Sequence, residues 1–317
     1  MKRNLIAALA AVLLLGAAAG YILYVRQPSI PSPTVAAQQV EPGLQVLSNG
    51  LLSTVPLTDP QGSRTVTALQ CDRAHAAAST VACLVPVDAF TGTRLRVLDR
   101  QLRVRREIPL TGFPNRLRVS ASGRMVAWTL FVDGHSYATT GFSTSTGILD
   151  TKTGALVASL EDLASTVDGR PYRAVDTNFW GVTFAGDDNR FYATMSTGGQ
   201  RYLVEGDFAA RTMRTLARNV ECPSLSPDGK RIAYKAAVDG DPRKGWRLSV
   251  LDLATLAVTP TSETRSVDDQ PLWTDDETVA YSLQRSDGVN DVWTVPSAGG
   301  GEPRLLVPEA NSPAILT

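Results

Sequence analysis

Histidine and cysteine, which often carry nucleophilic and metal chemistry, are scarce in this sequence. Its 317 residues include two histidines, His75 and His135, and three cysteines. A serine hydrolase needs a histidine beside a serine on a sharp turn, and the sequence has no G-x-S-x-G segment for that turn. A zinc site needs several nitrogen or sulfur ligands at close spacing, and no such cluster occurs. We therefore expect both histidines to lie in solvated loops, without a catalytic or metal-binding role.

Pairs of adjacent aspartates are the other candidate ligands. They are Asp187 and Asp188, Asp268 and Asp269, and Asp275 and Asp276. Around the mouth of a channel, such carboxylates could hold calcium through oxygen ligands. However, the sequence lacks the D-x-[DN]-x-[DN]-G loop of calcium sites, and aspartate is a common turn residue. The turn interpretation is favoured, and the sequence predicts neither a metal nor another cofactor.

Two of the three cysteines are predicted to form a disulfide. Cys71 and Cys83 fall on segments 66–71 and 81–85, which we expect to be adjacent strands of one sheet. Neighbouring strands bring Cα atoms within bridging range, and an address outside the cytoplasm permits the bond. Cys222 is left over and is expected to be a buried thiol.

A repeated turn motif indicates which elements position these residues. Its clearest copy is Ser226, Pro227, Asp228, Gly229 and Lys230. Proline presets φ for a tight turn, aspartate bonds its own backbone, and glycine accepts positive φ. An apolar strand starts directly after the turn, and looser copies lie at 119–128, 184–193 and 272–281. The later copies recur about every 40–50 residues, which is the length of a four-stranded blade.

Residues 226–234 resemble the repeat of TolB-type β-propellers, which is related in pattern to the WD40 repeat. The resemblance implies an all-β, six-bladed β-propeller, and it concerns the fold, because one propeller scaffold serves many functions. Five blades are expected at about 66–109, 116–162, 177–216, 222–259 and 271–307. The hairpin Leu44–Leu57 and the last strand Ser312–Thr317 are expected to form the sixth blade together, which removes two free strand edges.

Residues 1–26 are predicted to be a single transmembrane helix that acts as a membrane anchor, or a signal segment. The apolar run from Leu5 to Val25 carries no charge and is long enough to cross a bilayer as a helix. The alternative is a cleaved signal peptide, because Ala17, Ala18 and Ala19 offer the small residues of a cleavage site. The basic residues before the run keep the N-terminus in the cytoplasm, so the propeller is expected outside it.

The remaining chain is predicted to consist of a linker and the propeller. Residues 27–43 contain four prolines among polar and small residues, which is typical of a semi-extended spacer. Residues 44–317 form the TolB-like propeller. TolB proteins carry an α/β domain before the propeller, and residues 26–43 are too few for such a domain.

Charge gives little indication of a partner. The formal net charge is zero, which does not favour nucleic acid. One basic run stands out, formed by Arg94, Arg96, Arg100, Arg103, Arg105 and Arg106. It could dock an anionic partner or lipid headgroups. Charged side chains also stop outer strands from pairing with other chains, and this edge-protecting role is the favoured interpretation.

Loops on a rigid scaffold are the usual place of recognition, so the longest insertions are the candidate binding loops. The insertion Asp133–Gly147 contributes Asp133, His135 and Tyr137, and Trp180 is the tryptophan expected at a loop surface. A second insertion spans Thr166–Asn178. A loop rich in Gly, Ser and Thr with a tyrosine suits adaptable polar contacts.

The sequence therefore predicts a membrane-tethered, extracytoplasmic propeller that binds a protein partner or an envelope ligand and is not an enzyme. The alternative is a propeller enzyme of the lyase or lactonase type that uses the central channel. A sensor that signals across the membrane is disfavoured, because only Met1–Asn4 precede the apolar run.

Overall fold

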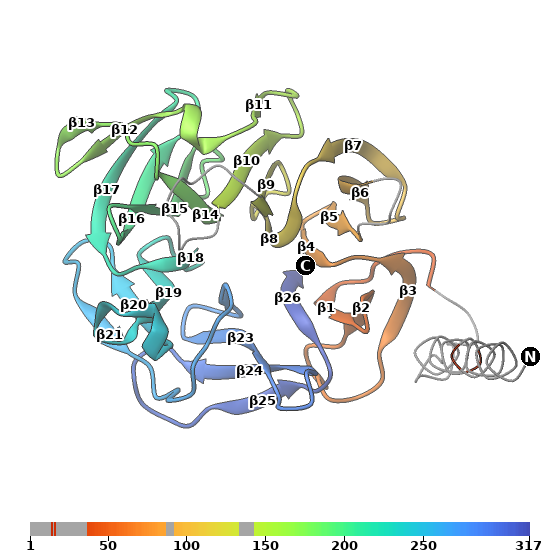
Figure 1. Cartoon of the computed structure of the whole chain (residues 1–317). Helices are drawn as coiled ribbons and strands as arrows, with labels where there is room; N and C mark the ends of the chain where they lie inside the picture. Colours follow the sequence, from red (N-terminus) through yellow and green to blue (C-terminus); the bar gives the residue numbers. More distant parts are fainter. Residues whose placement is uncertain (1–13, 15, 17–36, 87–91, 133–142) are drawn as a thin grey trace, which may run out of the picture. The chain divides into compact units, whose positions relative to one another are not determined.

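The computed structural model describes residues 14 and 16 and residues 37–86, 92–132 and 143–317 (Figure 1). The chain divides into two units, residues 1–36 and residues 37–317. Within the described ranges, no helix has the length and apolarity needed to cross a bilayer. Apart from Leu14 and Gly16, the predicted anchor Leu5–Val25 lies outside the described residues. The same is true of Asp133, His135 and Tyr137.

The second unit is a six-bladed β-propeller, as predicted: six β-sheets follow one another around a ring (Figure 1). Five blades are numbered in chain order, and the sheet that holds both ends of the ring is named the closing blade. Its strands, from the centre outward, are β26 (Asn311–Leu316), β1 (Gly43–Ser48), β2 (Leu51–Val55) and β3 (Thr65–Gln70).

The other blades contain consecutive strands that pair in chain order. Blade 1 consists of β4 (Arg73–Ala77), β5 (Thr80–Val85), β6 (Thr93–Asp99) and β7 (Val104–Leu110). Blade 2 consists of β8 (Phe113–Val119), β9 (Met125–Val132), β10 (Ser143–Asp150) and β11 (Leu156–Val157). Blade 4 consists of β18 (Glu221–Leu225), β19 (Arg231–Ala237), β20 (Trp246–Asp252) and β21 (Val258–Pro260). Blade 5 consists of β22 (Leu272–Trp273), β23 (Thr278–Gln284), β24 (Asn290–Pro296) and β25 (Arg304–Val307).

Blade 3 is larger because part of the second predicted insertion adds to it. Its main strands are β14 (Asn178–Phe184), β15 (Arg190–Thr197), β16 (Gln200–Asp207) and β17 (Thr212–Arg218). The hairpin β12 (Ala164–Val167) and β13 (Arg170–Tyr172) extends this sheet, since β12 pairs in parallel with β17. Three short 3-10 turns complete the described structure: η1 (Leu160–Asp162), η2 (Val238–Gly240) and η3 (Pro242–Lys244).

The ring closes through its two ends, as the sequence predicted. β26 pairs antiparallel with β1, with Ile315 opposite Leu44, and thereby becomes the inner strand of the N-terminal hairpin. Leu316 and Leu44 are buried there, each exposing no more than 1% of its surface. The pairing gives both strands a hydrogen-bonded neighbour, which removes the exposed edge that each would otherwise present.

One strand assignment is wrong. Residues 66–71 were expected to open the first full blade, but Thr65–Gln70 is the outermost strand of the closing blade. The opening strand is instead Arg73–Ala77, whose side chains are mostly buried. Alanine-rich Arg-Ala-His-Ala-Ala lacks the β-branched and aromatic residues typical of strands, so its sequence gives a weak strand signal. The structure buries this strand because it lies at the centre of the ring.

The core consists of apolar layers between neighbouring blades. One layer joins β8 and β9 to blade 1 through Leu117, Trp128 and Leu84. Another joins blades 4 and 5, with Leu248 on blade 4 and Trp273 and Tyr281 on blade 5. Trp180, which was expected at a loop surface, instead lies on inner strand β14 and exposes only 4% of its surface. That prediction is wrong, because the sequence pattern around Trp180 did not reveal the inner strand to which it belongs.

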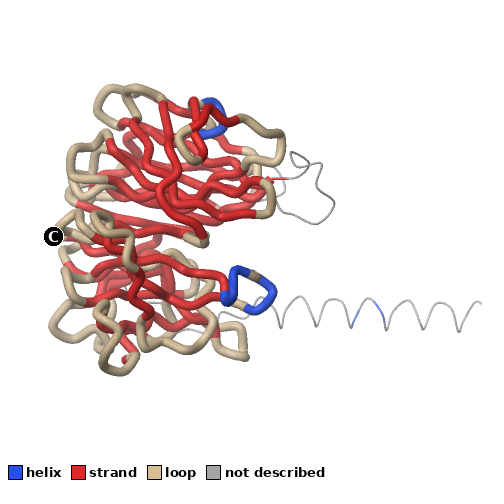
Figure 2. Tube along the Cα trace, turned by 90° about the vertical axis from the view of Figure 1, so that its left-hand side faces the viewer, coloured by secondary structure: helices blue, strands red, loops and turns tan. Residues whose placement is uncertain are grey.

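Strand direction gives the ring two distinct faces. Each inner strand starts at one face, here called the entry face, and ends at the opposite one, the turn face. Antiparallel pairing then places the connections from second to third strands, and those between blades, at the entry face. Figure 2 views the ring from the side, with η2 and η3, which connect β19 to β20, opposite the C-terminus, which follows β26.

Candidate functional site

The inner strands are irregular near the entry face. Register shifts occur in β8 between Pro114 and Arg116, in β14 between Trp180 and Thr183, and in β18 between Glu221 and Ser224. Gly181 has φ +67°, and a Cβ on it would lie 2.7 Å from the Cα of Cys222. Only glycine therefore fits this close approach of β14 to β18. Bulges of this kind redirect side chains and often lie beside functional sites.

Three arginines border a small cavity at this end of the channel. They are Arg73 at the start of β4 and Arg116 and Arg118 on β8, and the cavity volume is about 30 Å³. Arg116 and Arg118 are two residues apart, which places them on the same side of a strand. Both are buried, with 8% of their surface exposed. A cavity of this size holds only a few atoms.

His75 packs against Arg118 in the wall of the cavity. Its Nε2 lies 3.2 Å from Nη1 of Arg118, and its Nδ1 lies 3.3 Å from the backbone nitrogen of Val119. Both neighbours are donors, while a neutral imidazole offers one acceptor nitrogen and an imidazolium offers none. Burial and the charge of Arg118 accordingly hold the pKa of His75 well below its usual value. The expectation of a solvated loop histidine is therefore wrong for His75.

The buried arginines use their terminal nitrogens within the protein. Arg118 donates from Nη2 to the carbonyl oxygen of Pro271 at 2.9 Å. Arg116 donates from Nη1 to the carbonyl oxygen of Asn115 at 3.1 Å, and its Nη2 lies 3.6 Å from a carboxylate oxygen of Asp268. In the described part of the chain, the Nε atoms of both arginines have no hydrogen-bond partner. A buried donor without a partner costs about 1–3 kcal/mol, so these two atoms are an unfavourable feature of the cavity wall.

The two buried arginines differ in their electrostatic surroundings. Burial lowers the pKa of Arg118 to about 10, so it stays cationic at neutral pH. Burial also disfavours the charge of Arg116, but the nearby Cys222 and the carboxylates of Asp269 and Asp268 outweigh it and raise the pKa of Arg116. Both guanidinium groups are therefore fixed positive charges in the wall of the cavity.

A larger polar cleft lies beside this cavity. Its volume is about 340 Å³, and Arg73 and Asp269 line both spaces. The other residues that line the cleft include Asp268, Ser282, Asn290 and Asn311. Within the described residues, the half-buried guanidinium of Arg73 forms no hydrogen bond or ion pair. Burial lowers the pKa of Arg73, as does the charge of Arg116.

The two aspartates at the cleft already have partners. Asp268 forms an ion pair with Lys235, and burial, which raises its pKa, is outweighed by Lys235, Arg116 and Arg73, which lower it. Asp269 accepts a hydrogen bond from the backbone nitrogen of Ser282 at 2.9 Å. The turn interpretation is thus wrong for this pair of aspartates. It holds for Asp187 and Asp275, each of which accepts backbone N–H groups of its own turn.

The predicted cysteine pair is joined, but between blades. Cys71 directly follows β3 of the closing blade, Cys83 lies on β5 of blade 1, and their Cα atoms are 5.5 Å apart. The prediction placed both on one blade, because it assigned residues 66–71 to the wrong sheet. Cys222 is a buried free cysteine. The described residues contain no group of three or more His, Cys, Asp or Glu side chains that could hold a metal ion.

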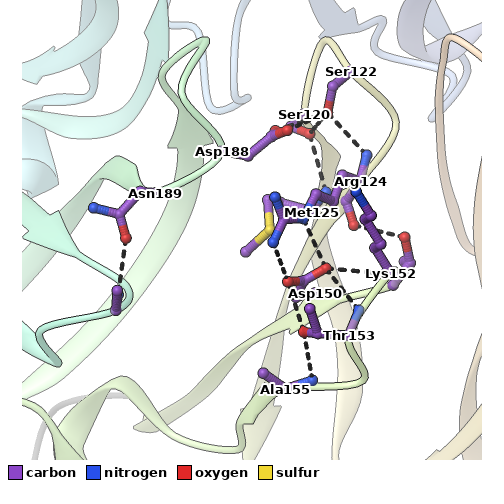
Figure 3. Close-up of polar contacts among 12 residues, drawn as sticks. Ser120, Ser122, Arg124, Met125, Asp150, Lys152, Thr153, Ala155, Asp188 and Asn189 are labelled. Atoms are coloured by element: carbon purple, nitrogen blue, oxygen red, sulfur yellow. Dashed lines mark hydrogen bonds and ion pairs between the residues drawn. The ribbon is translucent and has the colours of Figure 1, made fainter.

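The turn face is organised by the repeat itself. In the motif copy of blade 4, Gly229 donates to the carbonyl oxygen of Ser226 at 2.9 Å, and Lys230 donates from its backbone to Asp228 at 3.1 Å. Figure 3 shows the corresponding region of blade 2, where Arg124 and Asp150 form two hydrogen bonds of 2.6 and 3.0 Å.

Neighbouring turns also contact each other across blades. In the same view, Ser122 of blade 2 donates to Asp188 of blade 3 at 2.7 Å (Figure 3). These side chains satisfy one another, so this face presents a set of mutually bonded turns.

The basic run lies on the outer strands of blade 1. Arg96 pairs with Glu107 at 2.6 Å, and Arg105 pairs with Asp99 at 2.6 Å. Its members belong to β6, to the exposed outermost strand β7 or to the turn between them. This is the placement that the edge-protecting interpretation requires.

The arginines at the cavity were missed by the sequence analysis. A signal was available: Asn-Arg-Leu-Arg-Val at 115–119 alternates charged and apolar residues just before a repeat turn. Such charges on an expected inner strand must face the channel, because the opposite side packs between blades.

Comparisons with known proteins identify the fold of this six-bladed β-propeller. No family model and no curated protein matches the chain. Among solved structures, TolB from Acinetobacter baumannii is similar with a TM-score of 0.54 and 17% identity, covering 86% of this chain and 66% of that one. A putative TolB from Agrobacterium tumefaciens has a TM-score of 0.52 and 11% identity, covering 85% of this chain and 90% of that one.

A third similar structure is a nidogen/laminin complex, with a TM-score of 0.57, 12% identity and coverage of 87% of this chain and 98% of that one. Because the sequence identities are this low, the structural similarity shows the fold alone, which is that of a TolB-like propeller. The chain spans 66% of the length of the Acinetobacter protein.

Proposed function

We propose that this protein is an extracytoplasmic, membrane-tethered binding propeller that holds a protein partner or envelope ligand at its entry face. The observation that carries the proposal is the polar cleft of about 340 Å³ beside a cavity with unpartnered arginine donors. Binding sites are concave and use a few placed polar groups to fix a ligand. On the turn face, by contrast, the repeat side chains bond their own turns and one another.

The chemistry of the cleft favours binding over catalysis. A general base must accept a proton near neutral pH. His75 faces a donor at each ring nitrogen, Asp268 is paired with Lys235, and Asp269 accepts a backbone N–H group. The arginines are donors only. The cleft therefore offers fixed charges and hydrogen bonds for recognition.

The compartment and the tether are part of the same proposal. The disulfide between Cys71 and Cys83 supports an oxidising environment. The uncharged apolar run Leu5–Val25 supports membrane attachment. The nidogen/laminin structure supports partner binding by this fold, since it is a complex of two proteins.

The proposal is tested by cross-linking in intact cells that produce the full chain, followed by identification of the attached partner. The key variant is Arg73→Gln at the cleft. Lys152→Gln is the matched control, because it removes one positive charge from an exposed side chain on the turn face. We expect the wild type and the control to capture the same partner and Arg73→Gln to lose it. Equal capture by all three proteins, or turnover of a glycan or lactone by purified protein, would contradict the proposal.

A further inference from the structure

We propose that the cavity between Arg73, Arg116 and Arg118 is a carboxylate-binding site that receives one acidic group of the ligand. This inference rests on the proposed binding function and specifies the chemistry of what is bound. A guanidinium is a planar set of N–H donors whose geometry matches a carboxylate. Three of them border one small space, and the donors that they leave unused determine what that space can bind.

The unused donors can be identified atom by atom. Arg116 and Arg118 direct their terminal nitrogens to protein oxygens or to His75, and each leaves a buried Nε without a partner among the described residues. Arg73 has no hydrogen bond or ion pair in the same part of the chain, so its donors are also free. Asp269 also lines the cavity, and one of its carboxylate oxygens accepts the backbone N–H group of Ser282. Three guanidinium groups therefore face a single carboxylate around this space, and this excess of cationic donors favours an anion.

The charges near the cavity and the cleft leave an excess of one positive charge. The cations are Arg73, Arg116, Arg118, Lys235 and Arg201, and the carboxylates are Asp72, Asp268, Asp269 and Glu221. His75 is neutral at ordinary pH because its pKa is low. An uncompensated buried charge is unfavourable, and a single bound anion would remove it.

The dimensions favour a carboxylate attached to a larger molecule. About 30 Å³ admits only a few atoms, so a carboxylate head fits and a bulky polyanion does not. Arg73 and Asp269 line both spaces, so the body of the ligand can occupy the cleft of about 340 Å³ while its acidic group reaches the arginines. Asp268 and Asp269 repel additional negative charge, which favours a monovalent group.

Such a carboxylate has two possible sources with the same chemistry: a free small acid, or an acidic terminus or side chain of a partner protein. The test uses the detergent-solubilised full chain in halide-free buffer. Carbon-13 formate is the smallest probe, and its line broadening reports binding. A short peptide with a free C-terminal carboxylate, and the same peptide as its amide, then compete against formate.

We expect saturable formate binding that Arg73→Gln weakens at least about tenfold, while Lys152→Gln leaves it unchanged. Arg73→Lys keeps the charge but loses the planar set of donors, so its affinity should be intermediate. This variant separates recognition from misfolding, and thermal melting of each variant checks the fold. Competition by the acid peptide but not by its amide would identify a chain terminus, and formate binding without peptide competition would identify a free small acid.

Other results would overturn the inference. Absence of formate broadening, equal affinity in Arg73→Gln, or sulfate binding in place of formate would each do so. The outcomes also separate this inference from the proposed function. If the protein captured its partner but did not bind formate, the carboxylate site would be disproved and the proposed binding function would stand. If it bound formate but captured the same partner with or without Arg73, the proposed binding function at this cleft would be disproved and the carboxylate site would stand.

Discussion

The two faces of the ring differ in how far apart in the sequence many of their hydrogen-bonded residues lie. On the turn face, Asp228 and Asp150 accept hydrogen bonds from backbone groups two or three residues away. On the entry face, Arg118 bonds Pro271, a residue 153 positions away, and Gln270 bonds Val182, a residue 88 positions away. The bonds of Asp228 and Asp150 form within a single blade, although Ser122 and Asp188 also join the turns of neighbouring blades. The bonds of Arg118 and Gln270 exist only when separate blades have come together around the ring.

This difference predicts which changes affect both faces and which affect one. Loss of ring closure should destroy the entry face and weaken the whole domain. Loss of a turn interaction should lower stability without changing binding. Loss of an unpaired entry-face arginine should change binding without changing stability.

The largest effect is expected from deletion of residues 311–317, which removes β26. The closing blade then loses its inner strand and the buried side chain of Leu316, together with half-buried Ile315. Each large apolar side chain contributes about 1.5–3 kcal/mol, so the loss should reach several kcal/mol. Thermal melting measures it, and an unchanged melting temperature would show that the ring is held closed in another way.

A smaller loss is expected when Cys71 and Cys83 are both replaced by serine. The disulfide links residues 12 positions apart and joins two blades, and a bridge of this loop length contributes about 3 kcal/mol in the chain-entropy model. Urea unfolding of the double variant and the wild type measures the difference. Free thiols at both positions in protein from an oxidising compartment would show that the disulfide does not form. Equal urea midpoints would show that the disulfide does not contribute the expected free energy of unfolding.

Arg124→Gln tests the turn face and should cost less again. It removes two hydrogen bonds to the buried carboxylate of Asp150. The side chain of Arg124 is itself exposed to solvent, which screens the pair, so the loss should be smaller than that of the disulfide. Urea unfolding at neutral pH measures the loss. Formate binding should stay at the wild-type level, and a loss of binding would mean that the two faces are coupled.

The same pair predicts a pH dependence. The hydrogen bonds from Arg124 lower the pKa of Asp150 well below its ordinary value near 4, despite the opposing effect of burial. The folded state therefore binds this proton less readily than the unfolded state. The stabilisation is complete above about pH 4 and declines as the pH falls. Urea unfolding between neutral and acid pH should show a smaller decline in Asp150→Asn, and parallel curves would contradict this origin.

The smallest effect on stability is expected from Arg73→Gln. Its guanidinium has no hydrogen bond or ion pair among the described residues, so the change in unfolding free energy should lie within about 0.5 kcal/mol. Urea unfolding checks this value alongside the loss of formate binding. A large destabilisation would show that Arg73 supports the fold and would weaken its assignment to a binding site.

The distances involved also explain which features the sequence could predict. The turn at Ser226–Lys230 is encoded by adjacent residues, so the repeat, the six blades and their closure by the chain ends were predictable. His75, Trp180 and the pair Asp268–Asp269 were misplaced, because their burial or partners come from strands on other blades.

Arg116 and Arg118 were missed for a similar reason. Their significance depends on a cavity formed by separate strands around the centre of the ring, and local sequence does not reveal which charges will meet there.

The disulfide has a mechanical consequence. A force applied to the N-terminal segment would reach the ring near Ala37, whose backbone bonds Val66 of the closing blade, and Val40, whose backbone bonds Arg100 of blade 1. The bond between Cys71 and Cys83 joins the same two blades. If a pull broke these two hydrogen bonds, the disulfide would still hold the closing blade and blade 1 together. Reduction of this disulfide should therefore lower the force at which the closing blade separates from blade 1.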